Sequence, residues 1–174
     1  MADENITLNG FIIGLCEAPY RWIKQATEEL TDEQLYHQPT PETNSVAWLI
    51  WHLSRWRDKI GAVIADQSQV WVNEGWDQRF GMTGDRTGLG DTMEQVAAFH
   101  VERDLLAGYA DAAHNAIVSR VSSFTQDQLE KSIDYARGSE RPAWRALISV
   151  VEDSAEHAGQ INYIRGIVSG HGWR

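Results

Sequence analysis

The fold is indicated most directly by residues 150–164, which read VVEDSAEHAGQINYI. Apolar side chains recur there at the spacing of an α-helix, so one face of the segment is expected to point into a core. Asp153 and His157 lie on or beside that face, four residues apart. Residues i and i+4 of a helix lie one turn apart on the same side. The pattern therefore predicts a carboxylate and an imidazole stacked where apolar side chains would be expected.

A second stretch of this character lies much earlier, at residues 44–56 (NSVAWLIWHLSRW), where His52 falls on the flank of an apolar helix face. Burying a carboxylate costs several kcal/mol unless it is paired or bound to a cation. Helical bundles build metal sites from side chains on facing helices. We therefore expect His52, Asp153 and His157 to bind one divalent metal and leave a fourth position open, as in catalytic zinc sites. The alternative is a buried His–Asp hydrogen-bond network without a metal.

Composition fits one ordinary globular domain spanning residues 1–174. The chain has 174 residues, 43% of them hydrophobic and 23% charged, and a domain of this length can bury a substantial core. The net charge of −10 argues against nucleic acid or an anionic membrane surface as a partner. The lone Cys16 excludes an internal disulfide, and no apolar run reaches the roughly 20 residues of a membrane helix. Because no basic leader is visible, we expect a cytoplasmic protein.

Helical periodicity and capping signals predict an all-α protein, a four-helix bundle whose second and fourth long helices carry the metal ligands. No stretch reads as a convincing strand. Pro19 is expected to kink or break the first helix, and a long functional loop is expected at residues 68–90. The long helices are expected at residues 7–30, 44–67, 91–122 and 142–169, with short capped helices near residues 31–35 and 125–129.

Two motifs resemble those of the DinB-like superfamily of bacterial metal-binding four-helix bundles. They are SVAWLIWHL at residues 45–53 and HAGQINYIRG at residues 157–166. The order and lengths of the expected helices fit that family along nearly the whole chain. Its members typically bind a divalent metal through one histidine on the second helix and an H-x-x-x-H pair on the fourth, which fall on His52, Asp153 and His157. Asp153 departs from this pattern, since many members have histidine there, but a carboxylate can also ligate Zn²⁺.

The resemblance implies a site for Zn²⁺, or for Ni²⁺ or another transition ion. Characterised members include thiol transferases that use bacillithiol or mycothiol, and a mycothiol-dependent isomerase. The implied function is thiol S-transfer to an electrophile in detoxification, with a metal that holds a low-molecular-weight thiol as thiolate. Twelve arginines against three lysines are typical of GC-rich bacterial genomes and favour mycothiol. A homodimer is also expected from the family and from the aromatic-rich sequence.

Two other classes of function stay open. A metal-dependent hydrolase or isomerase would use the same open position for water or substrate. A non-enzymatic binding or stress protein would need the three residues only as a structural polar cluster. Turnover without added thiol would separate the first from a thiol transferase, and the absence of copurifying metal would indicate the second.

Residues near the ligands in sequence are candidates for supporting roles. Gln160 lies three residues after His157 and is expected either to support that ligand or to lie at the bundle edge. Arg55 and Arg165 are candidates for binding an anionic thiol or substrate, although surface ion pairs are the simpler interpretation.

Aromatic and histidine residues elsewhere have weaker claims. Trp76, Arg79 and Phe80 are candidates for covering the metal and contacting substrate, and the simpler interpretation is a loop held down by its aromatic side chains. His114 is interpreted as a surface histidine, and Cys16 as a small buried apolar residue rather than a nucleophile.

Overall fold

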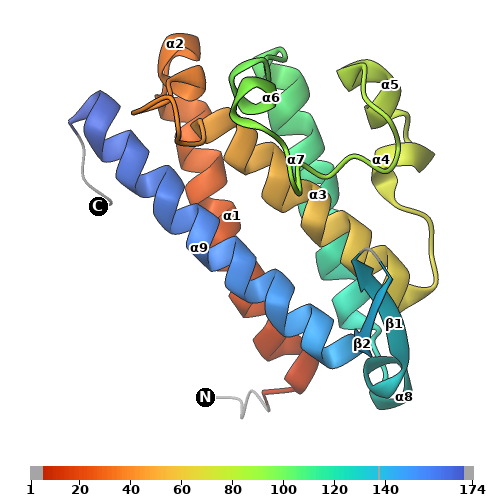
Figure 1. Ribbon diagram of the computed structural model, residues 1–174. Coiled ribbons are helices and arrows are strands. Elements are labelled where there is room, and N and C mark those ends of the chain that lie inside the picture. Colours follow the sequence, from red (N-terminus) through yellow and green to blue (C-terminus); the bar gives the residue numbers. More distant parts are fainter. Residues whose placement is uncertain (1–5, 137, 171–174) are drawn as a thin grey trace.

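A computed structural model describes residues 6–136 and 138–170 and shows a four-helix bundle, which confirms the expected all-α fold (Figure 1). Each long helix packs against two others, in the order α1, α7, α3, α9 around the bundle. No helix within the described ranges is long and apolar enough to cross a membrane. The long helices are α1 (Leu8–Glu29), α3 (Val46–Ala65), α7 (Arg103–Ser122) and α9 (Ala143–Ser169).

The bundle pairs two parallel helices on each side. Midway along α3, Arg55 donates to the Tyr109 hydroxyl of α7, and farther along Asp58 pairs with Arg120. The two helices therefore run in the same direction, as do α1 and α9 on the other side (Figure 1). A parallel pair needs a connection that returns along the whole bundle. Residues 66–102 form that crossover.

The crossover is more structured than the sequence pattern predicts. Within the expected loop it forms α4 (Val70–Asn73) and α5 (Trp76–Phe80), and a separate α6 (Met93–Ala97) precedes α7. The prediction of one helix over residues 91–122 is thus wrong. The chain leaves helical conformation at residues 98–102, and Phe99 turns into the core, where it is 4% exposed and packs on Trp51. Burial of that ring offsets the helical turn that is lost.

A short hairpin contradicts the expectation that the chain has no strand. β1 (Ser132–Ala136) pairs antiparallel with β2 (Ser139–Pro142) between α8 (Gln126–Glu130) and α9. Ile133 is buried, and the Tyr135 ring packs edge-on against Trp56 and accepts a hydrogen bond from its indole nitrogen. These two inward side chains hold the hairpin against α3. Two alternating positions are too few to give a clear strand pattern.

The capping signals were sound predictors of the short helices. Thr31 caps α2 (Asp32–Tyr36) and Thr125 caps α8, each through a complete capping box. α1 continues through Pro19 as one helix, so the alternative of a break there is wrong. Cys16 is buried, as expected for a small apolar residue.

Buried charges fasten the crossover to α3. The Asp58 carboxylate accepts hydrogen bonds from the backbone nitrogens of Val70 (3.0 Å) and Trp71 (2.8 Å) and pairs with Arg120 at 2.9 Å. Arg55 is fully buried and donates to the backbone carbonyls of residues 84 and 86 and to the Gln69 amide. Both side chains are satisfied by several partners, so this network holds the returning chain against the helix that carries His52.

Candidate metal centre

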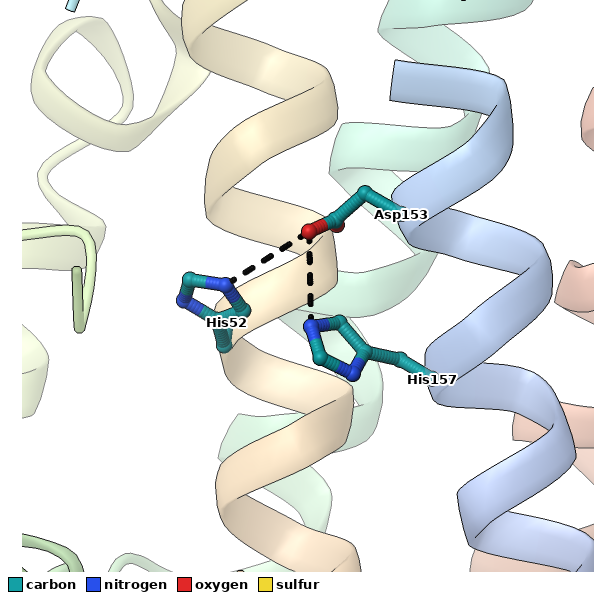
Figure 2. Close-up of side chains that lie close together, drawn as sticks. All are labelled: His52, Asp153 and His157. Carbon is teal, nitrogen blue, oxygen red and sulfur yellow. Dashed lines mark ion pairs between the residues drawn. The ribbon is translucent and has the colours of Figure 1, made fainter. Parts of the chain in front are cut away.

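Three side chains from two helices meet at the seam between α3 and α9 (Figure 2). His52 projects from α3, and Asp153 and His157 project from consecutive turns of α9. Asp153 Oδ1 lies 3.8 Å from His52 Nε2 and 3.4 Å from His157 Nε2. One donor atom from each residue lies within 4.8 Å of the others. The three residues indicated by the sequence are therefore brought together.

The hydrogen bonds of the two imidazoles fix which nitrogen faces the centre. His52 Nδ1 lies 2.6 Å from the Thr87 carbonyl oxygen, which can only accept, so Nδ1 carries the proton. His157 Nδ1 likewise donates to Gln160 Oε1 at 3.0 Å. In the neutral imidazoles, both Nε2 atoms therefore present lone pairs toward Asp153. This is the arrangement of histidine metal ligands, whose other nitrogen is held by an oxygen acceptor.

The Asp153 carboxylate is only half satisfied. Its Oδ1 faces the two imidazoles, whereas Oδ2 is buried and has no hydrogen-bond partner among the described residues. A buried carboxylate oxygen without a partner is costly. Two imidazole lone pairs beside a carboxylate also make a region that attracts a cation. The donor set of two nitrogens and one oxygen suits Zn²⁺ and other borderline transition ions, so these residues fit a divalent metal.

Burial and charge shift the two histidines in opposite directions. Burial lowers the pKa of His52 below its ordinary value, and the nearby Asp153 charge only partly offsets this. Burial acts the same way on His157, but the hydrogen bond and charge of Asp153, together with Gln160, outweigh it and raise its pKa. His52 is therefore the histidine that stays neutral most readily, and His157 must give up its proton before it can bind a cation.

Aromatic rings and the crossover enclose His52. The Trp48 ring stacks on the imidazole at 4.7 Å, almost parallel to it, one turn earlier on α3. Gly88 of the crossover lies against the same place with a positive φ of 87°. A Cβ at Gly88 would come within 2.8–2.9 Å of Trp48, Trp51 and His52 Nδ1. Only glycine lets the chain approach closely enough for Thr87 to bind His52.

Arg57 is a neighbour of the site that sequence reasoning missed. It is 1% exposed, and its Nε donates to Ser154 Oγ at 2.8 Å while Nη2 donates to the Cys16 carbonyl at 3.1 Å. Its charge interacts with Asp153, which is adjacent to Ser154 in α9. The signal was present, since Arg57 follows the apolar Leu53 by one turn and shares its helix face. It places a buried cation close enough to Asp153 to interact with the carboxylate.

The other residues singled out from the sequence fall in different places. Gln160 joins the triad through His157. Arg165 is 2% exposed and pairs with Glu29 of α1, and Arg55 is buried beneath the crossover, so the simpler interpretation of both as surface ion pairs is wrong. In the fold, Arg165 links α9 to α1 and Arg55 links α3 to the crossover. Binding of a thiol or substrate by either arginine stays a prediction.

The three candidates of the crossover lie in an aromatic cluster away from α9. Trp76 and Phe80 are buried and pack near Tyr109, and Arg79 stacks over the Trp76 ring at 3.4 Å. α5 packs against α4 and α7, on the side of α3 opposite α9 in Figure 1. These contacts favour a packing role, and the substrate role expected as the alternative stays a prediction.

His114 corrects another expectation. The sequence predicts a surface histidine, yet His114 is 5% exposed on α7. Its Nε2 lies 3.3 Å from a Glu17 carboxylate oxygen, and its ring stacks on Tyr20 at 3.7 Å. Because histidine is polar and α7 carries many polar residues, the sequence of α7 alone does not indicate that His114 is buried against α1.

The fold and the triad together define a helical bundle with a three-donor centre between its second and fourth long helices. The sequence matches the model of the DinB superfamily over residues 20–161, and the chain belongs to that superfamily. It is also similar to a solved structure described as the conserved protein of locus from Enterococcus faecalis, with a TM-score of 0.84 and 22% identity over 95% of this chain and 99% of that chain. That likeness shows the fold alone. A comparison with curated proteins found no match.

Proposed function

We propose that the protein binds a divalent metal at His52, Asp153 and His157 and transfers a low-molecular-weight thiol to an electrophile. The observation that supports this most directly is the convergence of two imidazole Nε2 atoms on a carboxylate whose second oxygen is buried and unpartnered. Membership of the DinB superfamily supports it independently. Zn²⁺ is the first choice of metal, with Ni²⁺ as the alternative.

The chemistry follows from what a cation supplies in such a place. A bound divalent cation would stabilise the thiolate form of a coordinating thiol, which is the nucleophilic form. The chain's own residues prepare that step. Thr87 and Gln160 hold the two imidazoles in the tautomer that presents Nε2, and Asp153 supplies negative charge to retain the cation. Mycothiol is the thiol that the sequence composition favours.

A hydrolase or a thiol-dependent isomerase would use the same three residues, and a non-enzymatic metal-binding stress protein would use them only for binding. A conjugation assay with a chlorodinitrobenzene electrophile separates these classes. We expect product formation that requires added thiol and is lost in His157→Ala. Turnover of ester substrates without thiol would instead support a hydrolase. Metal binding with neither activity would support the stress protein.

Elemental analysis of tag-free protein tests the metal itself. We expect about one equivalent of metal in the wild type, as in a mononuclear site, and its loss in His157→Ala. His37→Ala is the matched control, because His37 is exposed at the end of α2 and should leave the metal content unchanged. Absence of metal after incubation with Zn²⁺ or Ni²⁺ would contradict the proposal.

Self-association through α1 and α9 is a further part of this proposal. Large apolar side chains are exposed on both helices, and between them lies a groove whose floor includes Ala158 and Gly159. The surface formed by α1 and α9 thus has both protruding apolar side chains and a groove that could receive those of a second copy. The interface of a two-fold dimer must be self-complementary in this way. Light scattering should give the mass of a dimer for the wild type and of a monomer for Tyr163→Glu. The exposed residues are Leu8, Phe11, Leu15, Trp144, Ile148, Tyr163 and Ile167.

A further inference from the structure

A hollow lies along the seam between α3 and α9, and its lining begins one helical turn from His52 and His157. It measures about 330 Å³ and is closed on its third side by the connection between α2 and α3. Gln160 lines it, and the side-chain amide of Gln160 also accepts the hydrogen bond of His157. Leu49 also lines it and precedes His52 by one turn on α3. A ligand whose sulfur lies at the triad can therefore extend into this hollow.

The lining combines apolar walls with free polar groups. Leu49 and Ile164 supply the apolar part of the lining and are 0% and 5% exposed. Glu42 and Asn44 also line the hollow, and neither side chain has a hydrogen bond to any other residue in the described part of the chain. Their oxygen and nitrogen atoms are available to a ligand.

The charge of the lining favours neutral ligands over anionic ones. Among residues 6–136 and 138–170, those that line the hollow include one carboxylate, that of Glu42, and no basic side chain. The Glu42 carboxylate would repel an anionic group on a ligand in the hollow, and the net charge of −10 acts in the same direction. Hydroxyl and amide groups, by contrast, can pair with the carboxylate and with the amides of Asn44 and Gln160. The volume is at the small end for ligand pockets, which suits one ring-sized group.

We propose that this hollow holds the sulfur-free part of the thiol and selects neutral thiols rich in hydroxyl or amide groups over anionic thiols. The inference rests on the thiol-transfer function proposed above. Glu42 determines the charge preference, and Asn44 and Gln160 bind the hydroxyl groups. Gln160 contributes to both the hollow and the triad, because it also holds the imidazole of His157.

Cobalt-loaded protein provides a test that does not depend on turnover. Thiolate coordination to Co²⁺ produces a charge-transfer absorption band, whose growth during titration gives a dissociation constant. The probes are thioglucose, which is neutral and hydroxylated, and mercaptosuccinate, which carries two carboxylates. The variants are Glu42→Lys and Glu42→Gln. The control is Glu130→Lys, which changes the net charge equally at α8, near the opposite end of the bundle (Figure 1).

We expect the wild type to prefer thioglucose, and Glu42→Lys to reduce the preference by about tenfold or more, which corresponds to about 1.4 kcal/mol. Glu42→Gln should show a smaller reduction, and Glu130→Lys none. Comparing ratios between variants cancels the intrinsic difference between the two thiols. Equal ratios in all four proteins would overturn the inference and leave the proposed function standing. If neither thiol produced the band on cobalt-loaded protein, the thiol function would fail, and this inference with it.

Discussion

Two clusters of polar side chains on α3 differ in how completely they are satisfied. The Asp58 carboxylate, fully buried, receives two backbone hydrogen bonds and pairs with Arg120. The Asp153 carboxylate facing His52 keeps one buried oxygen without a partner in the described structure. Both clusters join α3 to another segment of the chain. Only the first is complete within the protein, so we infer that the first stabilises the fold and the second is built to receive a cation.

The difference shows how a structural polar network can be distinguished from a binding site. Identity of the residues does not separate them, because both contain an acid among nitrogen-bearing side chains. The completeness of the hydrogen bonding does separate them, since a network that stabilises the fold leaves few buried polar atoms without partners. The following predictions test this contrast, starting with the largest expected effect.

Removing the Asp58 carboxylate should have the largest effect. Asp58→Ala leaves the buried Arg120 and Arg55 without their acid, and breaking a buried pair in this way costs about 3–5 kcal/mol. Urea unfolding in the presence of a chelator measures the loss of unfolding free energy. Asp85→Ala, at an exposed position of the same crossover, is the control and should change it by less than about 0.5 kcal/mol. Equal effects of the two variants would contradict the structural role of Asp58.

Gly88→Ala should be the next most costly. It combines a positive φ with contacts of 2.8–2.9 Å to three rings, and we expect a loss of about 2–4 kcal/mol. Gly81→Ala is the matched control, because Gly81 also has a positive φ, of 65°, but nothing lies within 4 Å of its Cβ position. The difference between the variants in thermal unfolding reports the close approach to His52. No difference would show that the crossover adjusts freely there.

Asp153→Asn should separate metal binding from stability. Without metal, the variant should unfold within about 1 kcal/mol of the wild type, because it removes a charge that is only half satisfied. Zn²⁺ at about a hundred times its dissociation constant should stabilise the wild type by roughly 2.7 kcal/mol and the variant by much less. Differential scanning fluorimetry with and without Zn²⁺ measures both. An equal shift of the unfolding temperature by Zn²⁺ in the two proteins would show that Asp153 does not bind the metal.

Gln160→Ala should weaken metal binding without abolishing it. The variant removes the acceptor that holds His157 Nδ1, and loss of such support typically lowers metal affinity about 10- to 100-fold. Competition with a chromophoric chelator measures the affinity. Gln126→Ala, which breaks an exposed hydrogen bond to Glu130 on α8, should leave it unchanged. An unchanged affinity in Gln160→Ala would mean that packing alone orients His157.

The smallest expected effect is a pH dependence due to His114, whose Nδ1 is buried without a hydrogen-bond partner in the described structure and whose Nε2 pairs with Glu17. Burial lowers its pKa below the ordinary value of 6.5, and Glu17 only partly offsets this. The unfolded chain therefore takes up the proton first as the pH falls. The stability advantage of the wild type over His114→Gln should be full above pH 6.5 and decrease below it. Urea unfolding of both proteins across that range measures it, and parallel profiles would contradict the assignment.

Much of the candidate metal centre was predictable because its geometry is local. Asp153 and His157 share a helix, so their four-residue spacing places them together, and helical periodicity also put His52 on an inward flank. The fold followed from the same periodicity and from the resemblance to a family. The hydrogen bond from His52 to Thr87 was not predictable, since a glycine-rich segment carries no pattern that indicates which helix it will contact.

The errors have a common physical origin in contacts between distant segments. Arg55 and Arg165 were interpreted as surface residues because charge usually indicates exposure, but a carbonyl-lined crossover and Glu29 of α1 supply partners inside the structure. The hairpin and the end of α6 depend on two aromatic side chains, Tyr135 and Phe99, that dock on tryptophans of α3. Such docking is decided by tertiary packing, which overrides local preference.

The parallel arrangement of α3 and α7 has a consequence for how this site can diversify. Each helix has 20 residues and is roughly 30 Å long, so the chain must travel back over that distance whatever its sequence. The segment that covers His52 is thus obligatory in length but free in composition wherever it does not touch α3. Descendants of such a protein can exchange most of this covering segment without altering His52, Asp153 or His157. The topology therefore lets the crossover vary in sequence while the two helices that carry His52, Asp153 and His157 stay unchanged.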